Sequence, residues 1–384
     1  MSRPIPVLLM TYSLGIGGSE RQMAEVAMAL DPARFQVHAG CLRADGMRAG
    51  ELRAAGIPIL ELPVTSFGSL SALKGARMLL RYIREHRIEL VHSFDVPLNI
   101  FAAPVAWFAR KPIVLTSQRA HRLLTPGLFH RWLRVTDRLT DGIVVNCEYM
   151  RRHLIRDENV PERIVHLCYN GIDAEVFQPK SSGAVVATHP KLESASVVIG
   201  VVCSLRREKG LDTLMAGFAP VAREHIGARL LVVGSGRELE GLQSQARALG
   251  VFDQCVFVPA TDQVAPWLRA MDIFVLPSLS EAFSNSLMEA MACGCCAVAS
   301  DVGGNPELAG DPRRGVLFEA GNARGLGSIL RGLIGDPERR KSLAAAGSDF
   351  LRKEFSIARA ADRMGEIYDI FLSGRERPRD IHQR

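Results

Sequence analysis

Short apolar runs alternate with longer amphipathic stretches along the first half of the chain. Apolar runs of this length, separated by stretches long enough for helices, are typical of a parallel sheet covered by helices. Seven runs follow this pattern: residues 5–11, 35–41, 57–62, 89–94, 112–117, 142–147 and 163–168. The first half is therefore predicted to be an α/β unit built on one parallel sheet.

The same alternation begins again after residue 196. Six further apolar runs are residues 197–203, 228–234, 255–260, 272–277, 296–300 and 315–318. Residues 178–196, between the two series, are rich in Pro, Ser, Gly and Thr and have no periodicity, which is typical of a linker. We therefore predict two Rossmann-like, doubly wound domains, at residues 1–178 and 197–356.

The end of the chain has a different pattern. Residues 322–347 and 357–373 are amphipathic with a helical period and are predicted to form helices. The last ten residues, 375–384, are mostly polar or charged and are expected to form a tail.

Doubly wound sheets bind ligands at the carboxyl ends of their strands, so site residues are expected in the loops that follow strands. The first such loop contains Gly15, Gly17 and Gly18 and leads into a helix near Ser19. Glu20 stands where the dinucleotide-binding pattern has its last glycine, which disfavours a nicotinamide cofactor. Two interpretations stay open: the backbone N–H groups of Gly17 and Gly18 approach an anion, or the glycines only make a tight turn.

Length and composition limit the class of protein. The 384 residues correspond to two or more typical domains, and 47% hydrophobic with 23% charged residues is ordinary for a globular protein. No apolar run reaches the length of about 18 residues that a membrane-spanning helix needs, and the N-terminus has the pattern of a first strand, so a cytoplasmic location is expected. The eight cysteines lack the spacing of a zinc site, and no metal is expected.

The positive charge lies in the first half of the chain. Residues 1–170 carry 22 Lys/Arg against 15 Asp/Glu, whereas residues 171–384 carry 25 against 26. Residues 110–156 alone have ten basic and three acidic side chains. This stretch is a candidate contact for phosphates or for an anionic membrane face, and nucleic acid is not an expected partner.

One basic segment has helical spacing. Arg131, Arg134 and Arg138 are three and four residues apart and can share one helix face, with Trp132 among them. Beside the apolar stretch 100–108, such a face suits a lipid-linked acceptor at an anionic membrane. The alternative is a solvated helix face with a buried Trp132.

Residues 277–294 carry the clearest chemical pattern. They follow the apolar run 272–277 and lead into a helix that Ser284, Asn285 or Ser286 would cap. Glu281 precedes this helix and Glu289 lies inside it, so a helix N-terminus and two carboxylates come together where a diphosphate could bind. The alternative is a capping box, in which Glu289 only accepts a backbone N–H near Ser286.

The segment EAFSNSLMEAMACG (281–294) resembles the Glu, seven residues, Glu motif of the retaining glycosyltransferases of family four, whose fold is called GT-B. Further similar segments are GIGGSERQ (15–22), NGID (170–173), REKG (207–210), VVGSG (232–236) and SDVGGNPE (300–307). The resemblance implies two domains facing across a cleft. The first would bind the acceptor, the second would bind a nucleotide-sugar, and the helix at 357–373 would pack back on the first.

The resemblance also implies roles for individual residues. Glu289 would accept hydrogen bonds from the ribose hydroxyls, Glu281 would face the transferred sugar, and Lys209 would neutralise the leaving phosphate. The backbone amides expected to contact sugar and diphosphate are those of Phe283, Ser284 and Asn285. Since Lys209 supplies the positive charge, neither a metal nor another cofactor is required.

The chain departs from the family pattern at two places. The family often has an Arg five positions before its Lys, and here that position is Ser204. Arg206 or Arg207 is expected to replace it, unless both are solvated surface residues. In the first half, Gln118 stands where many members have a His, which leaves Arg119 and His121 as the acceptor-side candidates. A surface histidine beside Arg122 is the alternative for His121.

Together these features predict a retaining glycosyltransferase that moves a sugar from a UDP- or GDP-sugar to a hydroxyl of a glycan, lipid-linked or other acceptor. Synthesis of a cell-surface polysaccharide or glycolipid, in the cytoplasm or at the inner face of the plasma membrane, is the expected setting. The alternatives are a nucleotide-sugar epimerase or sugar-phosphate synthase on the same fold, and a non-catalytic carbohydrate-binding protein. Lys209, Glu281 and Glu289 together argue against a non-catalytic protein.

Overall fold

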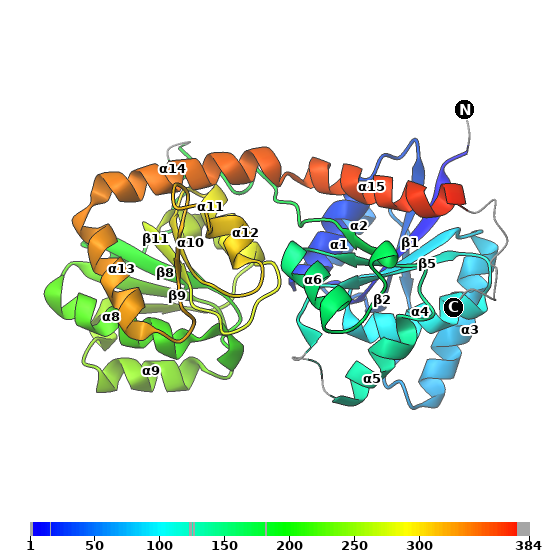
Figure 1. Cartoon of the computed structure of the whole chain (residues 1–384), viewed down its shortest axis with the longest axis horizontal. Helices are drawn as coiled ribbons and strands as arrows, with labels where there is room; N and C mark the ends of the chain where they lie inside the picture. Colours follow the sequence, from blue (N-terminus) through cyan, green and yellow to red (C-terminus); the bar gives the residue numbers. More distant parts are fainter. Residues whose placement is uncertain (1–2, 16, 123–124, 126, 181–182, 375–384) are drawn as a thin grey trace. The chain divides into compact units, whose positions relative to one another are not determined.

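A computed structural model of the chain describes residues 3–374, apart from 16, 123–124, 126 and 181–182. The chain divides into two compact units, each with its own parallel sheet (Figure 1). Unit 1 comprises Met1–Gly171 and Ile357–Arg384, and unit 2 comprises Ile172–Ser356. The polar tail expected at 375–384 lies outside the described residues.

The sheet of unit 1 has seven parallel strands in the order β3-β2-β1-β4-β5-β6-β7. The strands are β1 (Ile5–Ser13), β2 (Phe35–Arg43), β3 (Ile59–Glu61), β4 (Leu90–Ser93), β5 (Ile113–Gln118), β6 (Gly142–Val145) and β7 (Val165–Leu167). Each of the seven predicted runs overlaps one of these strands. Val7 of β1 lies between Val37 of β2 and Leu90 of β4, so the strand order reverses beside β1. At such a reversal the loops diverge and leave room for a ligand.

Helices cover both faces of this sheet. They are α1 (Gly18–Ala29), α2 (Met47–Ala54), α3 (Leu70–Glu85), α4 (Val96–Phe108), α5 (Gly127–Thr136), α6 (Glu148–Arg156) and α15 (Ile357–Ser373), with the short 3-10 helix η2 (Glu162–Ile164) before β7. Val7 and Leu9 of β1 pack into a core shared with α1, α2 and α15. Leu8 and Met10 pack on the opposite face with α3 and α4. Burial on both faces is why the strands are continuously apolar rather than alternating.

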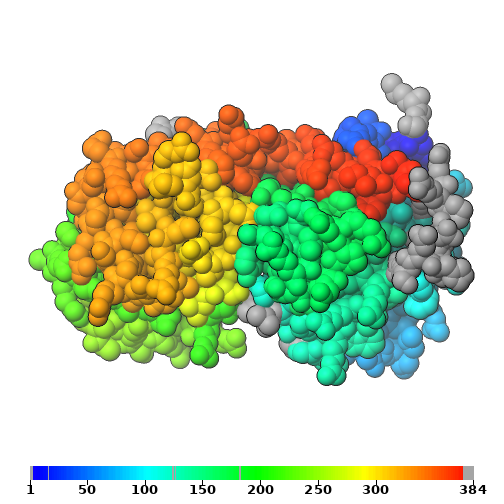
Figure 2. Space-filling view, viewed as in Figure 1, coloured from blue at the N-terminus to red at the C-terminus, as the bar shows by residue number. Residues whose placement is uncertain are grey.

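The last helix, α15, belongs to unit 1 although its sequence follows unit 2. It packs against α1, and Met364, Ile367 and Tyr368 are fully buried in the core of unit 1. Figure 2 shows its surface in red beside the blue N-terminal part of the chain. The C-terminal segment therefore completes the first unit.

The sheet of unit 2 has six parallel strands in the order β10-β9-β8-β11-β12-β13. The strands are β8 (Val197–Val202), β9 (Ala228–Val233), β10 (Cys255–Val258), β11 (Ile273–Leu276), β12 (Cys296–Ser300) and β13 (Val316–Phe318). All six predicted runs contain a strand. As in unit 1, the order reverses beside the first strand of the sheet, between β8 and β11.

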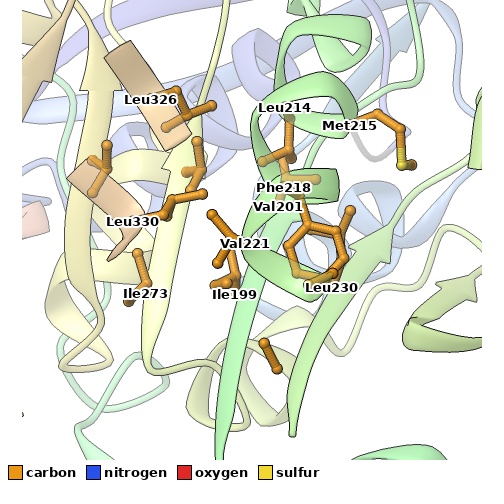
Figure 3. Packing of buried hydrophobic residues seen from close by; sticks show 14 of the residues in the cluster. Ile199, Val201, Leu214, Met215, Phe218, Val221, Leu230, Ile273, Leu326 and Leu330 are labelled. Carbon is orange, nitrogen blue, oxygen red and sulfur yellow. The ribbon is translucent and has the colours of Figure 1, made fainter. Parts of the chain in front are cut away.

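The helices of unit 2 are α7 (Pro190–Glu193), α8 (Leu211–Glu224), α9 (Leu239–Ala248), α10 (Val264–Arg269), α11 (Asn285–Ala292), α12 (Asn305–Ala309), α13 (Ala323–Gly335) and α14 (Pro337–Glu354), with the short 3-10 helices η4 (Arg207–Lys209) and η5 (Phe252–Gln254). Phe218 of α8 and Leu326 of α13 pack with Ile199 of β8 in one buried core (Figure 3). No helix in the described part of the chain is long and apolar enough to cross a membrane.

Two segments differ from the sequence-based expectation. Residues 322–347 form two helices rather than one, because Pro337 starts α14 and the Asp336 side chain accepts a hydrogen bond from the backbone N–H of Arg339 at 2.9 Å. Residues 178–196 belong to unit 2, and the chain passes between the units at Gly171–Ile172. The buried Arg269 guanidinium anchors the start of this stretch by donating to the carbonyls of Gln178 and Val185.

Candidate active site

Three loops meet at the carboxyl edge of the sheet of unit 2. They follow β8, β11 and β12, which are neighbours in the sheet, so parallel pairing brings their carboxyl ends to one edge. The loops carry Lys209, Glu281 and Gly303. Residues nearly 100 positions apart in the sequence thus form one surface.

Lys209 and Glu281 form an ion pair at this edge. The Lys209 Nζ donates to Glu281 Oε2 at 2.6 Å, and the Ser278 hydroxyl donates to the same oxygen at 3.2 Å. The side chains of Lys209 and Glu281 are 21% and 13% exposed, so the pair is shielded but reachable. Burial lowers the pKa of Lys209, but the charge and hydrogen bond of Glu281 outweigh burial and raise that pKa above its ordinary value. Lys209 is therefore a permanent cation.

Lys209 is positioned by contacts between its own loop and the loop after β11. The backbone N–H of Leu279 donates to the Glu208 carbonyl at 2.8 Å. Gly210 has a φ of +61°, and a Cβ there would lie 2.2 Å from the carbonyl oxygen of Pro277. Glycine is required on both counts, because the backbone is left-handed and the other loop is in contact with it.

The Glu281 loop is held from its other side by the loop after β12. Gly304 donates its N–H to the Ala282 carbonyl at 2.6 Å, and the Ser300 hydroxyl donates to the Ser278 carbonyl at 2.6 Å. Gly303 has a φ of +59°, and a Cβ there would lie 1.9 Å from the Glu281 carbonyl oxygen. The position of Glu281 thus depends on a glycine that follows a different strand.

Helix α11 begins directly after this loop. Ser284 is its N-cap, and the Ser284 hydroxyl accepts from the Leu287 N–H at 3.3 Å. A capping box at Glu289 would need Ser286 as the N-cap, whereas the cap is Ser284 and the partner position of its capping box is Leu287; the ribose contact of Glu289 stays a prediction. Glu289 instead lies a turn into the helix, with 4% of its surface exposed. Phe283, also predicted in this site, packs against Phe355 at a ring distance of 5.7 Å.

Arg206 and Arg207, the candidates to replace the Arg absent at 204, are both exposed. Arg206 precedes η4, its side chain is 61% exposed, and its Nη1 lies 3.9 Å from Glu208 Oε1. A catalytic role for Arg206 stays a prediction.

The glycine loop of unit 1 leads into α1, with Gly17 as N-cap and Gly18 as first residue. The Ser13 hydroxyl donates to Glu20 Oε1 at 3.1 Å, and a Cβ on Gly17 would overlap the Glu20 carboxylate. This helix N-terminus therefore already faces an acidic side chain. Binding of donor by Gly17 and Gly18 stays a prediction.

Arg119, the first acceptor-side candidate, follows β5 in unit 1. Its Nη1 donates to Asn170 Oδ1 at 2.7 Å, and its guanidinium carbon lies 4.9 Å from the centre of the Phe94 ring. Its buried Nε has no hydrogen-bond partner, and no carboxylate lies within ion-pair distance in the described chain. Burial lowers its pKa to about 10, so Arg119 is charged at neutral pH. A half-buried cation without a counter-ion favours an anionic ligand.

A hydrogen-bonded chain beside Arg119 was not predicted from the sequence. His92 of β4 bonds through Nδ1 to the Tyr368 hydroxyl and through Nε2 to the Ser117 hydroxyl, both at 2.9 Å. Burial, with a smaller contribution from the charge of Arg119, holds the pKa of His92 well below its ordinary value. His92 is therefore a neutral structural residue. No local motif joins it to Tyr368.

His121 is buried in the loop after β5, and its ring centre lies 4.0 Å from that of His153 on α6. Burial and the nearby His153 lower its pKa. The alternative of a surface histidine is wrong, whereas the acceptor-side role stays a prediction. Gln118 turns into the same loop, since its Nε2 donates to the Ala120 carbonyl and its Oε1 accepts from Arg122.

Asp95 at the end of β4 is a titratable group that the sequence analysis missed. It caps α4 by accepting from the Leu98 N–H at 3.0 Å and also accepts from the Tyr12 N–H near the end of β1. Burial is the largest influence on its pKa and raises it to about 6, so Asp95 can hold or release a proton near neutral pH. An acid followed by Pro97 after a strand is a helix-start signal that could have revealed it.

Within the described residues, no group of three or more His, Cys, Asp or Glu side chains is arranged to hold a metal ion.

Two family models match this chain. The model described as Glycosyltransferase Family 4 matches residues 16–176, and the model described as Glycosyl transferases group 1 matches residues 188–350. The first match lies mostly in unit 1 and the second lies in unit 2.

Among curated relatives, a D-inositol 3-phosphate glycosyltransferase from Segniliparus rotundus is 32% identical over 241 residues. This alignment covers 61% of this chain and 53% of the relative, so the chain spans about half the length of that protein in the match. A GDP-mannose-dependent monoacylated alpha-(1-6)-phosphatidylinositol monomannoside mannosyltransferase from Corynebacterium glutamicum is 25% identical over 379 residues, covering 95% of this chain and 98% of the relative.

Solved structures show the same fold. The crystal structure of Anabaena Alr3699/HepE in complex with UDP-glucose has a TM-score of 0.80 and 21% identity, covering 95% of this chain and 100% of that one. A sucrose-phosphate synthase from Thermosynechococcus elongatus has a TM-score of 0.78 and 18% identity, covering 96% and 100%. The two units therefore have the GT-B fold.

Proposed function

The chain belongs to family four of the glycosyltransferases, and we propose that it transfers a sugar from a UDP- or GDP-sugar to an acceptor hydroxyl with retention at the anomeric carbon. The observation that carries this proposal is the Lys209–Glu281 ion pair, placed just before the N-terminus of α11. A permanent cation and the positive end of a helix both favour a diphosphate.

The donor would bind to unit 2. Lys209 and the first backbone amides of α11, including those of Phe283, Ser284 and Asn285, would meet the diphosphate and the sugar. Glu289 would accept hydrogen bonds from the ribose, and Glu281 would face the transferred sugar. The UDP-glucose complex of the structurally similar Anabaena protein supports a nucleotide-sugar as the ligand of this fold.

In the proposed reaction the bond between the anomeric carbon and the phosphate oxygen breaks while the acceptor oxygen bonds to the same face of that carbon. The acceptor proton passes to the leaving diphosphate. Negative charge therefore grows on the diphosphate, where Lys209 stabilises it, so that no metal and no other cofactor is needed. Arg206 would add a second positive charge from the same loop.

The acceptor would bind to unit 1, with Arg119 toward an anionic group and with His121 in the same loop. Relatives named for inositol 3-phosphate and for a phosphatidylinositol mannoside support an acceptor that carries phosphate. We propose a glycan or lipid-linked acceptor, used in the synthesis of a cell-surface polysaccharide or glycolipid. The enzyme would act in the cytoplasm, peripherally at an anionic membrane surface.

A nucleotide panel followed by product analysis tests this function. A nucleotide present at 100 times its Kd adds about 2.7 kcal/mol to the stability of the protein that binds it, so thermal shift identifies UDP or GDP. The matching nucleotide-sugar is then incubated alone and with phosphate-bearing acceptors. Product with retained anomeric configuration is expected only when the acceptor is present. A changed sugar without acceptor would indicate an epimerase, a free sugar-phosphate acceptor would indicate a synthase, and binding without turnover would indicate a non-catalytic protein.

A further inference from the structure

Helix α5 in unit 1 is held to the protein by its polar side. His130 Nε2 lies 2.9 Å from Glu158 Oε1, and Arg134 Nε lies 3.3 Å from Glu158 Oε2. Just after the helix, Asp137 receives two hydrogen bonds from the buried Arg122 guanidinium, at 2.7 and 2.8 Å. Surface helices of globular proteins normally bury an apolar stripe. In α5, ion pairs on the polar side take the place of the buried apolar stripe.

The apolar side chains of α5 point outward instead. Only Leu133 and Thr136 of the helix are buried. Four large apolar residues are exposed, by 67%, 38%, 51% and 42% respectively: Leu128, Phe129, Trp132 and Val135. Leu128, Trp132 and Val135 have the spacing of one helix face. Phe108, the last residue of the neighbouring helix α4, is also exposed, by 68%.

The exposure of Trp132 bears on one of the two interpretations of the basic segment. Trp132 is exposed, so the part of the alternative that buries it is wrong, whereas contact of this segment with a membrane stays a prediction. The apolar stretch 100–108 is not part of the exposed surface as a whole, because Phe101, Ala102, Ala103 and Ala106 are buried in the core of unit 1. The exposed apolar surface comes from α5 itself; we call Leu128, Phe129, Trp132 and Val135 the α5 face.

The charges around the α5 face are unequally exposed. Arg131, Arg134 and Arg138 are exposed, as are Arg110 and Lys111 after α4. The nearby acids are turned inward, since the side chains of Asp137 and Glu158 are only 13% and 6% exposed and both lie within ion-pair distance of Arg122. The outer surface of α5 therefore combines apolar side chains with exposed arginines, of which Arg134 is paired with Glu158.

We propose that the α5 face docks onto a lipid bilayer that contains anionic headgroups. Apolar side chains at the level of the headgroups and cations beside the phosphates are the two contributions that hold a helix in the plane of a membrane. A second copy of this chain is a poorer occupant, because a symmetric contact would place the same arginines against each other. This inference rests on the proposed function in one respect only, which is that the acceptor is linked to a lipid.

Sedimentation with vesicles tests the proposal with the full chain. We expect binding to vesicles of phosphatidylcholine and phosphatidylglycerol at low salt, less binding to phosphatidylcholine alone, and loss of binding as salt rises. Leu128→Ser with Trp132→Ser should weaken binding at least tenfold, since both large side chains would leave water on docking. Leu70→Ser with Leu73→Ser is the matched control, because these residues of α3 are 82% and 55% exposed in the same unit. This control should bind as the unchanged protein does.

A second matched pair of variants tests how much the positive charge contributes to vesicle binding. Arg131→Ser should weaken binding to the anionic vesicles about fivefold, the usual contribution of one cation near such a surface. Arg81→Ser on α3, also exposed, should leave binding unchanged.

Three results would overturn the proposal: no preference for anionic vesicles at low salt, equal binding by the Leu128/Trp132 variant and the unchanged protein, or a dimer that this variant dissociates. Circular dichroism and thermal unfolding establish that each variant is folded. Nucleotide binding, measured on the same samples by thermal shift, separates a failure of this inference from a failure of the proposed function.

Discussion

The carboxyl edges of the two sheets are built in different ways, although both sheets are parallel and doubly wound. At the edge of unit 2 the charged side chains come from two short segments, 207–210 and 277–289. At the edge of unit 1, His92 and Tyr368 are hydrogen-bonded although 276 residues separate them in the sequence. The charged side chains of unit 2 thus belong to local sequence motifs. In unit 1, the polar side chains come together only because distant segments pack against each other.

The partners of the positively charged side chain also differ between the two edges. Lys209 in unit 2 has Glu281 as its counter-ion, so an incoming phosphate must compete with a carboxylate. Arg119 in unit 1 is held by the Asn170 amide oxygen and the Phe94 ring and has an unpaired buried Nε. The positive charge of Lys209 is therefore neutralised by a carboxylate, whereas that of Arg119 is held only by an amide oxygen and a ring.

Removing the cation of unit 2 should have the largest effect. Lys209→Ala is expected to lower kcat by about 100- to 1,000-fold, because Lys209 meets a charge that grows in the transition state. Affinity for the nucleoside monophosphate should fall much less. Steady-state kinetics and isothermal titration measure the two quantities, and Lys341→Ala on the exposed face of α14 is the control. Equal losses of turnover and of affinity would contradict this role.

The dependence of Glu281 on the loop after β12 can be tested through Gly303. Gly303→Ala should cost about 2–5 kcal/mol in free energy of unfolding, since it combines a left-handed backbone with overlap against the Glu281 carbonyl. Gly321→Ala has a similar φ of +79° but no atom within 4 Å of the added Cβ, so only the backbone cost of about 1–2 kcal/mol remains. Denaturant unfolding compares them. Equal destabilisation by the two variants would show that the Gly303 contact is not important.

A substitution at Glu289 tests whether this buried acid of α11 binds the nucleotide. Glu289→Gln should weaken nucleotide affinity by about 1.5–3 kcal/mol, the usual contribution of a hydrogen bond to a charged group. The fold should persist, because Ser284 rather than Glu289 caps the helix. Isothermal titration gives the affinity. An unchanged Kd would exclude the ribose contact.

The smallest effect is expected in unit 1. Tyr368→Phe keeps the ring but removes the hydroxyl that bonds His92 Nδ1, so a buried nitrogen loses its partner at a cost of about 1–2 kcal/mol. Faster amide hydrogen exchange should be confined to unit 1, and nucleotide affinity should not change. A change in nucleotide affinity would contradict an effect of this hydrogen bond on unit 1 alone.

Much of the fold followed from local patterns. All thirteen predicted apolar runs overlap strands, because burial on both faces of a parallel sheet leaves a continuous apolar run in the sequence. The start of α11 was also predicted, since a serine cap is a local hydrogen bond between Ser284 and Leu287. The break at Asp336–Pro337 was missed although its signal is local, a capping acid followed by a helix-starting proline.

The amino-acid sequence by itself determined the α/β class, the two sheets and the segments that carry Lys209, Glu281 and Glu289, because periodicity, caps and loop motifs depend on neighbours within a few residues. Only the tertiary structure decided that Tyr368 bonds to His92, that Gly303 supports Glu281 and that Trp132 points outward. Each of these depends on which distant segments pack together. A helix with apolar and charged faces has the same sequence pattern whichever face it buries, and in α5 the buried partners Arg122 and Glu158 select the charged one.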